Sequence, residues 1–330
     1  MFQKIVCITT RVGMVAGALL LSSELIAKQI DLNPTREAAW AAGFFNEKTR
    51  DDFLTTPRFP GLPGYRLSTG GGIMGLEWQV CPCSKNWQWG IAYRYDSTDL
   101  DTNQPVDSHP GFDQNFDSTR AIIYTRIDFC KPVYLTGMLS VAFNQYNIYQ
   151  NVGELPYPAV FGAYDGWQWS TQVELGYKLR YCGFTITPEL SLQYSNLKLD
   201  RYDLVSADVS NNQLITPISG QNDNALFTGF DLNIAYTNQF PKAQVNPYIH
   251  AAINYQTIEN SLQSFTAGNV LGGGSAFIYL DSPAARTSYQ VGAGIEVLGD
   301  KNVTVVMRYD YTARSDENDH TVLLSIKHDW

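Results

Sequence analysis

Four of the five cysteines have the widest choice of chemistry in this chain. Zinc binding and disulfide formation are both open to Cys81, Cys83, Cys130 and Cys182. The first two stand one residue closer together than the usual Cys-x-x-Cys pair of zinc sites. We therefore expect no metal and no other cofactor. The remaining interpretations are disulfides within the chain, a disulfide to a periplasmic partner protein, and free thiols.

The histidines and serines give little indication of catalysis. His109 and His320 stand near Asp107 and Asp319, but acidic connections offer such neighbours without any catalytic role. The sequence contains no Gly-x-Ser-x-Gly elbow of the serine hydrolases. We therefore expect no enzyme activity and no catalytic residues.

Any reactive side chain must be positioned by secondary structure, and residues 167–181 show its pattern most clearly. Apolar and polar residues alternate along this segment. The odd positions are Trp167, Trp169, Thr171, Val173, Leu175, Tyr177, Leu179 and Tyr181, and the even ones are Gln168, Ser170, Gln172, Glu174, Gly176, Lys178 and Arg180. Successive side chains of a strand point to opposite faces. About ten such residues cross a bilayer as a tilted strand. An apolar face beside a charged face is typical of a membrane barrel, with the apolar side chains outward.

Twelve segments of the chain fit this strand pattern. They cover residues 39–46, 66–80, 87–95, 121–129, 133–147, 167–181, 184–197, 226–236, 245–255, 288–297, 303–311 and a last segment that ends at the C-terminus. The first is centred on Trp40, Ala42 and Phe44. The last has Val322, Leu324, Ile326 and Trp330 on one face.

The connections between these segments alternate in length. The short ones are 81–86, 130–132, 182–183, 240–243 and 299–302, and the long ones are 47–65, 97–118, 148–166, 200–224 and 257–287, followed by 315–319. Outer-membrane barrels have short periplasmic turns, long outer loops and an even number of strands. The pattern predicts an all-β fold, a twelve-stranded antiparallel transmembrane β-barrel over residues 39–330, in the outer membrane of a Gram-negative-type cell.

The charged residues on the inner face are the candidate lumen lining. They are Glu77, Arg94, Asp96, Arg126, Asp128, Glu174, Lys178, Arg180, Glu189, Asp231, His250, Glu296, Arg308 and Asp310. Two interpretations stay open. The charges line a pore or selectivity filter, or they form salt bridges that fill and rigidify a narrow lumen. Twelve strands lie between small barrels with filled interiors and porins with open channels, so barrel size does not decide.

Composition excludes several classes of protein. Hydrophobic residues make up 44%, aromatic residues 13% and charged residues 17% of the chain, with 20 Tyr, 7 Trp and 26 Gly. No apolar run reaches the roughly 18 residues of a membrane helix, which excludes a helical membrane protein. The net charge of −9 argues against a nucleic-acid partner.

The N-terminus resembles an export signal. Lys4 and Arg11 precede the apolar run 12–21, and Ala27 is a plausible last residue before cleavage. We expect residues 1–27 to be a signal peptide and residues 28–38 a short segment in the periplasm or the lumen. The N-terminus of the barrel is then periplasmic.

The long connections are acidic. Residues 97–118 hold five aspartates, and divalent cations could bridge such carboxylates to lipopolysaccharide. No spacing matches a calcium loop, so an ordinary solvated loop is favoured. Membrane lipid and lipopolysaccharide are the expected surroundings of the barrel.

Several motifs of the chain resemble those of the autotransporter β-domain family. AAWAAGFF is similar to the Trp-containing first strand of that family, and GYRLSTGGGIMGLEW to the Gly-rich second strand. VELGYKLRY followed by FTITPELSLQYS resembles its mid-domain Gly-Tyr and proline strands. VNPYIHAAINY and YQVGAGIEV look like later strands. The resemblance covers residues 39–330 and rests on the order and spacing of loose motifs.

The resemblance implies a twelve-stranded barrel with a periplasmic N-terminus and, in typical members, a lumenal helix and an upstream passenger. Residues 28–38 are too short for a passenger, so we expect a stand-alone barrel. The C-terminal strand ending in Trp330 resembles the signal read by the barrel-assembly machinery, which we expect as a partner. Three functions remain: a surface-exposed structural barrel that presents its loops, a small-solute, porin-like channel, or a translocator for a passenger encoded elsewhere.

Overall fold

The computed structural model describes residues 37–50, 65–79, 87–102, 111–130, 132–151, 160–206, 215–218, 220–259, 265–267, 276–278, 286–299, 302–314 and 317–329. The predicted signal peptide, residues 1–27, lies outside these ranges, as do residues 28–36. Within the described ranges, no helix is long and apolar enough to cross a membrane.

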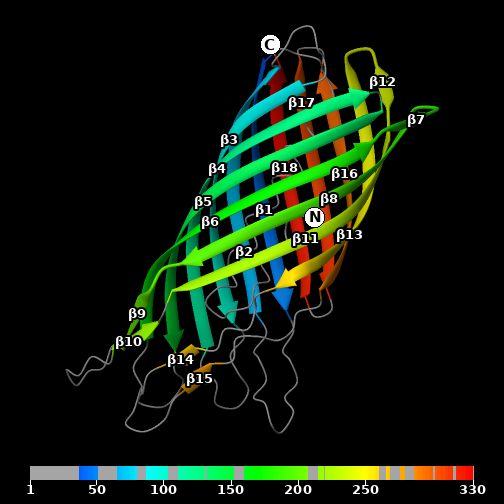
Figure 1. Cartoon of the computed structure of the whole chain (residues 1–330). Helices are drawn as coiled ribbons and strands as arrows, with labels where there is room; N and C mark the ends of the chain where they lie inside the picture. The colour runs from blue at the N-terminus through cyan, green and yellow to red at the C-terminus, as the bar shows by residue number, and fades with distance from the viewer. Residues whose placement is uncertain are drawn as a thin grey trace.

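Twelve long antiparallel strands close into a barrel (Figure 1). They are β1 (Glu37–Arg50), β2 (Tyr65–Gln79), β3 (Trp87–Thr102), β4 (Gly111–Cys130), β5 (Val133–Asn151), β6 (Val160–Tyr177), β8 (Phe184–Leu199), β11 (Gln221–Tyr236), β13 (Ala243–Glu259), β16 (Thr287–Gly299), β17 (Val303–Arg314) and β18 (Glu317–Asp329). Each pairs with the next, and β1 pairs with β18 from Ala38 opposite Asp329 to Arg50 opposite Glu317. This pairing closes the ring, so the predicted fold class is confirmed.

Six short strands extend the two ends of the barrel. β7 (Leu179–Tyr181) and β12 (Asn238–Phe240) continue β6 and β11 toward the short turns. At the opposite end, β9 (Tyr202–Ser206) pairs with the start of β6 and with β10 (Ile215–Ile218). β14 (Phe265–Ala267) and β15 (Ala276–Ile278) form a separate pair at this end (Figure 1). We name the two ends the short-turn rim and the long-loop rim.

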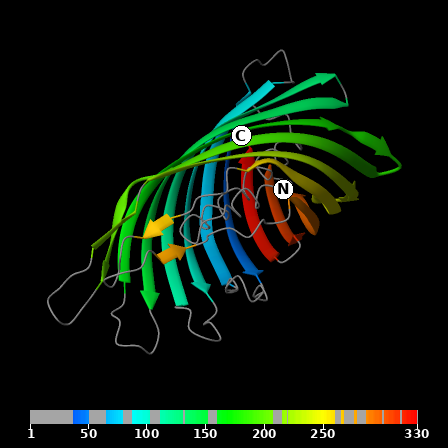
Figure 2. The ribbon, with the colours of Figure 1, turned by 60° about the horizontal axis from the view of Figure 1, so that its bottom comes forward.

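The strands present apolar side chains outward and polar ones inward. On β3, the exposed residues Trp87, Trp89, Ile91, Tyr93 and Tyr95 alternate with interior ones. The same alternation runs around the ring, and the strands curve about a common interior (Figure 2). Exposed aromatic residues, such as Trp87 and Tyr95 at the two ends of the outward run of β3, bound an apolar belt, as is typical of a transmembrane barrel.

The strands reach further toward the long-loop rim than the sequence predicts. β3 continues to Thr102 and β4 begins at Gly111, so residues 97–102 and 111–118 are strand rather than loop. Beyond Tyr95 the outward positions of β3 become polar, at Ser97, Asp99 and Asp101. The apolar–polar alternation therefore stops at the edge of the belt, while the backbone ladder continues past it.

The first strand has two of its three aromatic residues on the inside. Trp40 and Phe44, on which the first predicted segment is centred, are buried within the barrel. Gly75 and Gly71 stand directly opposite them on β2. A Cβ atom on Gly75 would lie 2.5 Å from the Trp40 ring. The glycines of β2 thus leave the space into which these rings fit, and the outward face of β1 carries Ala41, Gly43 and the exposed Phe45.

Candidate functional site: the polar bore

The strand alternation places ten of the fourteen predicted lumen residues among the buried side chains of the barrel interior. They are Glu77, Arg94, Asp96, Arg126, Glu174, Glu189, Asp231, His250, Arg308 and Asp310. Asp128, Lys178 and Glu296 are half-buried, and Arg180 is exposed. These four lie toward the short-turn rim.

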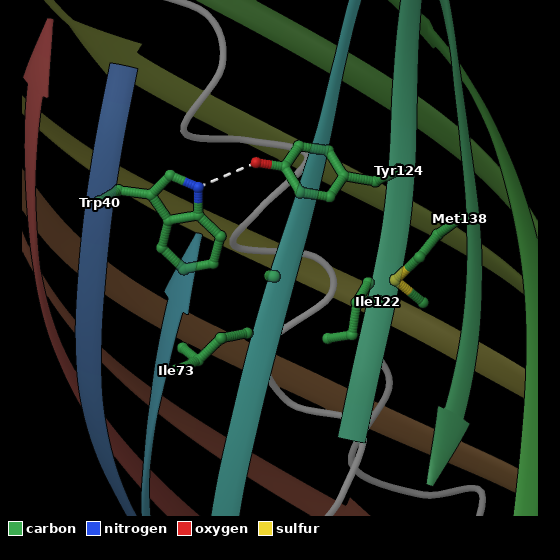
Figure 3. Close-up of a cluster of buried hydrophobic side chains, with 6 residues drawn as sticks. Trp40, Ile73, Ile122, Tyr124 and Met138 are labelled. Carbon is green, nitrogen blue, oxygen red and sulfur yellow. Dashed lines mark hydrogen bonds between the residues drawn. The ribbon is translucent and has the colours of Figure 1, made fainter. Parts of the chain in front are cut away.

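An interior network joins the strands on both sides of the closing seam between β1 and β18. The Trp40 indole Nε1 donates a hydrogen bond of 2.8 Å to the Tyr124 hydroxyl (Figure 3). That hydroxyl donates to Glu77 Oε1 at 3.1 Å, and Lys327 Nζ donates to Glu77 Oε2 at 2.7 Å. Asp329 Oδ1 lies 3.4 Å from the same ammonium. The network connects β4, β1, β2 and β18.

A second network surrounds His250 on β13. Its Nε2 lies 2.5 Å from Asp310 Oδ1 and 3.0 Å from an Arg308 Nη2, and its Nδ1 lies 3.4 Å from Asp231 Oδ2. Gly292 on β16 stands between His250 and Asp310. A Cβ at Gly292 would collide with both side chains, so this glycine permits the contact across the strand.

Tyr134 is the centre of a third network near the short-turn rim. The Arg126 guanidinium lies 3.8 Å from its ring centroid and Lys178 Nζ lies 5.1 Å from it, which are cation–π contacts. The Tyr134 hydroxyl donates to Glu189 Oε1. Its ring covers Gly176 on β6, where a Cβ would collide with it.

The interior opens at the short-turn rim into a cavity of about 570 Å³. Its wall includes the predicted lumen residues Lys178, Arg180, Glu189, Glu296 and Arg308. Arg308 pairs with Asp310 at 2.7 Å, and Glu296 accepts a hydrogen bond of 3.1 Å from Asn246. The wall of the cavity therefore carries charges of both signs beside apolar side chains such as Phe184 and Val306.

Toward the long-loop rim the interior is partly aromatic. The rings of Phe116, Tyr146, Tyr164 and Tyr202 stack in series, with centroids 5.2, 4.5 and 4.4 Å apart. At the same rim, between β1, β2 and β18, Glu317 pairs with Lys48 at 2.9 Å and accepts a hydrogen bond from Tyr65 at 2.8 Å. The stack joins β4, β5, β6 and β9 and holds the extended wall together.

These interior contacts follow the wall of the barrel. Trp40 to Tyr124 spans three strands of the ring, and the other pairs described above join strands one or two apart. Opposite walls of a twelve-stranded ring are six strands apart. The contacts therefore brace the wall locally and leave the axis unbridged by them.

The cysteine predictions can be followed only in part. Cys182 is an exposed free thiol in the turn between β7 and β8. Its φ of 47° and the φ of 84° at Gly183 form this tight turn. Cys81, Cys83 and the side chain of Cys130 lie outside the described residues, as does Trp330. Among the described side chains no group of three or more metal-ligating residues gathers.

Several interior charges were missed by the sequence analysis. They are Lys48, Arg120, Asp223, Arg314, Glu317, Asp319, Lys327 and Asp329. Extending the two-residue period past the apolar segments would have found most of them. His320, considered for catalysis, lies on the outside of β18, where its Nδ1 is 2.8 Å from the Tyr309 hydroxyl. His109 lies outside the described residues.

A closed barrel with an apolar exterior and a polar interior defines a class of protein, the outer-membrane β-barrels. Comparison with known proteins narrows the class. The model of the family described as autotransporter beta-domain matches residues 39–310. The chain belongs to the autotransporter β-domain family, and its location is the outer membrane.

Three similar proteins illustrate the relationship. The translocator domain of the autotransporter NalP from Neisseria meningitidis superposes with a TM-score of 0.69, at 14% identity over 93% of each chain. The β-domain of the Bordetella autotransporter BrkA gives 0.63 at 12% identity, covering 89% of this chain and all of that one. Outer membrane protein B of Rickettsia typhi is 23% identical over 299 residues, 87% of this chain. The chain spans 17% of the length of that relative.

Proposed function

We propose that this barrel is a membrane unit that presents its long-loop rim to the outside of the cell. The short-turn rim, where β1 begins and β18 ends, then faces the periplasm. The observation that supports this orientation is the change along the outward face of β3 and β4. Tyr95 ends the apolar run, and Asp99, Asp101, Asp113 and Asp117 follow on the extended wall.

The extended wall supports a surface role because its outward face suits water rather than lipid. The Tyr95 hydroxyl donates to Asp117 Oδ1 at 3.0 Å, at the boundary between the two. Burial and the charge of Asp101 raise the pKa of Asp113, further along the wall. We propose lipopolysaccharide head groups as the neighbours of this acidic face, and hydrocarbon as the neighbour of the belt below it.

Epitope accessibility tests the orientation. One tag is inserted at residue 106, in the long connection after β3, and a matched tag between Pro241 and Lys242, in the turn before β13. We expect antibody to label intact cells that carry the first tag. Cells with the second tag should be labelled only after the outer membrane is permeabilised. The reverse pattern, in barrels that still show heat-modifiable migration, contradicts the proposed orientation.

A second candidate function is passage of an attached chain segment through the bore. The wall-following contacts of the interior and the similarity to a translocator domain support it. The test is an N-terminal tag placed at residue 30. Surface labelling of that tag on intact cells supports passage. Labelling only after permeabilisation, with a properly inserted barrel, assigns the chain to surface presentation alone. A third function, a solute channel, is tested by recording the purified barrel in a planar bilayer. A channel would give a stable conductance, which neither surface presentation nor passage of a chain segment requires.

A further inference from the structure

His250 of β13 is a buried titratable side chain that lies between two carboxylates. Its Nε2 is 2.5 Å from Asp310 Oδ1 on β17, and its Nδ1 is 3.4 Å from Asp231 Oδ2 on β11. All three side chains are buried. The contact to Asp310 crosses β16 at Gly292, which stands directly opposite both residues and has no side chain to separate them. His250 therefore contacts two strands that do not pair with each other.

Only one protonation state of the ring suits both carboxylates. A neutral imidazole has one N–H donor and one nitrogen with a lone pair. Whichever nitrogen holds the proton, the lone pair of the other nitrogen faces a carboxylate oxygen, and the two repel each other. The imidazolium cation has a donor at each nitrogen, and opposite charges nearby favour the charged form of a titratable group. The geometry therefore favours the cation.

The charges around the ring favour the cation as well. Asp231 and Asp310 carry two negative charges between them, and Arg308, which pairs with Asp310 at 2.7 Å, carries one positive charge. A positive charge on His250 makes this group of four side chains neutral. Tyr248, two residues before His250 on the same strand, adds no charge because a phenol is neutral at physiological pH.

Two further carboxylates lie on the inner faces of the neighbouring strands. Glu189 of β8 stands directly opposite Asp231 and accepts a hydrogen bond from the Tyr134 hydroxyl. Glu296 of β16 accepts a hydrogen bond of 3.1 Å from Asn246. Neither group brings a positive charge toward the ring, so neither opposes its protonation.

We propose that His250 is a proton-dependent link between β11 and β17. With both ring nitrogens protonated, His250 holds Asp231 and Asp310 together across β16. Loss of the Nε2 proton turns this nitrogen into an acceptor, so its contact with Asp310 becomes repulsive. Arg308 Nη2, 3.0 Å away, is then a donor from which Nε2 can accept. Because Arg308 also lines the cavity at the short-turn rim, the same proton changes the charge beside that cavity.

Nitrogen NMR of the imidazole tests the protonation state directly. The chain has four histidines, so the full chain with His109→Gln, His320→Gln and His328→Gln leaves His250 as the single ring. This barrel is labelled with 15N-histidine and folded in detergent micelles. We expect His250 to hold both protons at pH 7.5, where an unperturbed imidazole is about nine-tenths neutral. The same chain unfolded in urea is the control, and its imidazole should be mostly neutral.

Substitutions of the partners test which groups hold the proton. Asp310→Asn keeps nearly the same shape but removes the charge in closest contact, so we expect His250 to lose its proton about one pH unit lower or more. Asp231→Asn should act in the same direction and more weakly, because its contact is longer. Arg308→Gln should act in the opposite direction, since it removes a positive charge.

Urea unfolding in lipid vesicles measures the effect of the link on the wall. A folded barrel that holds this proton more tightly than the unfolded chain loses stability as the pH rises past deprotonation. Between pH 5.5 and 9 we expect the unfolding equilibrium constant of the wild type to rise about tenfold more than that of His250→Gln. His320→Gln, changed on the outside of the barrel, is the matched control and should keep the pH dependence of the wild type.

Three results would overturn the proposal. The first is a neutral His250 in the folded barrel at pH 7.5, and this measurement decides the matter even where a partner variant fails to fold. The second is a pH of proton loss that Asp310→Asn leaves unchanged, because the carboxylate would then not hold the proton. The third is an equal pH dependence of unfolding in the wild type and His250→Gln.

Discussion

At the scale of single residues, the two faces of β6 should respond to charge in opposite ways. Val173 lies outside, in the middle of the apolar belt, and is 46% exposed. A lysine there places an ammonium in hydrocarbon, which costs about 2–4 kcal/mol near the bilayer midplane. We expect Val173→Lys to prevent stable assembly, measured as loss of the heat-modifiable folded band.

The neighbouring position supplies the control. Gln172 faces the interior, and its amide donates to the Glu174 carboxylate. A lysine at 172 can pair with that carboxylate, so we expect Gln172→Lys to insert normally. Equal behaviour of the two variants would refute the assignment of the faces.

Asp223 gives a prediction about pH. It lies beyond the belt on β11, level with the outward residues Asn222 and Asn196. Burial raises the pKa of its carboxyl to about 6 from the ordinary 3.8. The folded state therefore binds this proton more tightly than the unfolded state. The contribution of Asp223 to stability falls as pH rises from about 4 to 6, and levels off above.

The variant Asp223→Asn should remove this dependence. At pH 7 we expect it to stabilise the barrel by about 3 kcal/mol, the free energy of a pKa shift from 3.8 to about 6. At pH 4 it should be close to the wild type. Urea unfolding in lipid vesicles at the two pH values measures both differences. A variant that is less stable than the wild type at pH 7 would show that the carboxylate is paired in solution.

At the scale of elements, the seam between β1 and β18 depends on a polar network as well as on its backbone ladder. Lys327 of β18 reaches past β1 to Glu77 of β2, and both side chains are buried. Removing one partner leaves an uncompensated buried charge, which costs about 3–5 kcal/mol. We expect Lys327→Met to lower the free energy of unfolding by that amount, measured by urea titration.

The double variant Lys327→Met with Glu77→Leu separates the pair from packing. Without either charge, the remaining cost should be well below that of Lys327→Met alone, because buried ion pairs and apolar replacements are often of similar stability. A double variant that is as unstable as the sum of its single variants would mean that the two side chains act independently.

The strands also show which parts of the fold can be predicted from the sequence alone. All twelve segments were found because each must turn apolar side chains to lipid, a requirement that leaves a two-residue period. The outer parts of β3 and β4 were missed because the outward positions beyond Tyr95 are polar, while the apolar residues Leu100 and Phe116 point inward. The facing of β1 was obscured because its interior rings, Trp40 and Phe44, alternate with the small outward residues Ala41 and Gly43.

The interior networks could not be read from the sequence for a different reason. Alternation indicates that Glu77 and His250 point inward, but their partners come from strands up to 250 residues away. Which side chains meet depends on the register and shear of the closed ring. Pairing information of that kind is absent from any single segment. The glycines opposite bulky rings, such as Gly75, are recognisable only once the register is known.

At the scale of the whole molecule, closure of the ring places the first and the last strand side by side. The start of β1 pairs with the end of β18, so Ala38 lies opposite Asp329 at the short-turn rim. The C-terminal end of the barrel lies at that rim (Figure 1). Closing the ring therefore requires the last strand in full, and assembly cannot finish before it is in position.

This arrangement leads to a prediction about Trp330, which lies outside the described residues. The outward positions of β18 are Val322, Leu324, Ile326 and His328, and Trp330 follows at the same two-residue spacing in the sequence. We propose that the barrel-assembly machinery reads this apolar end. Deleting Trp330 should lower the inserted fraction several-fold in cells, measured as heat-modifiable protein in the outer-membrane fraction.

Two controls separate recognition by the assembly machinery from stability of the closed ring. Trp330→Phe keeps a large apolar ring at the end of β18 and should insert normally, which separates recognition of the ring from loss of one backbone residue. The truncated chain should also fold in detergent at nearly the wild-type yield, because the ladder between β1 and β18 reaches Asp329 without it. Normal insertion of the truncated chain in cells would exclude Trp330 as the assembly signal. Failure in detergent as well would instead assign the residue to the stability of the closed ring.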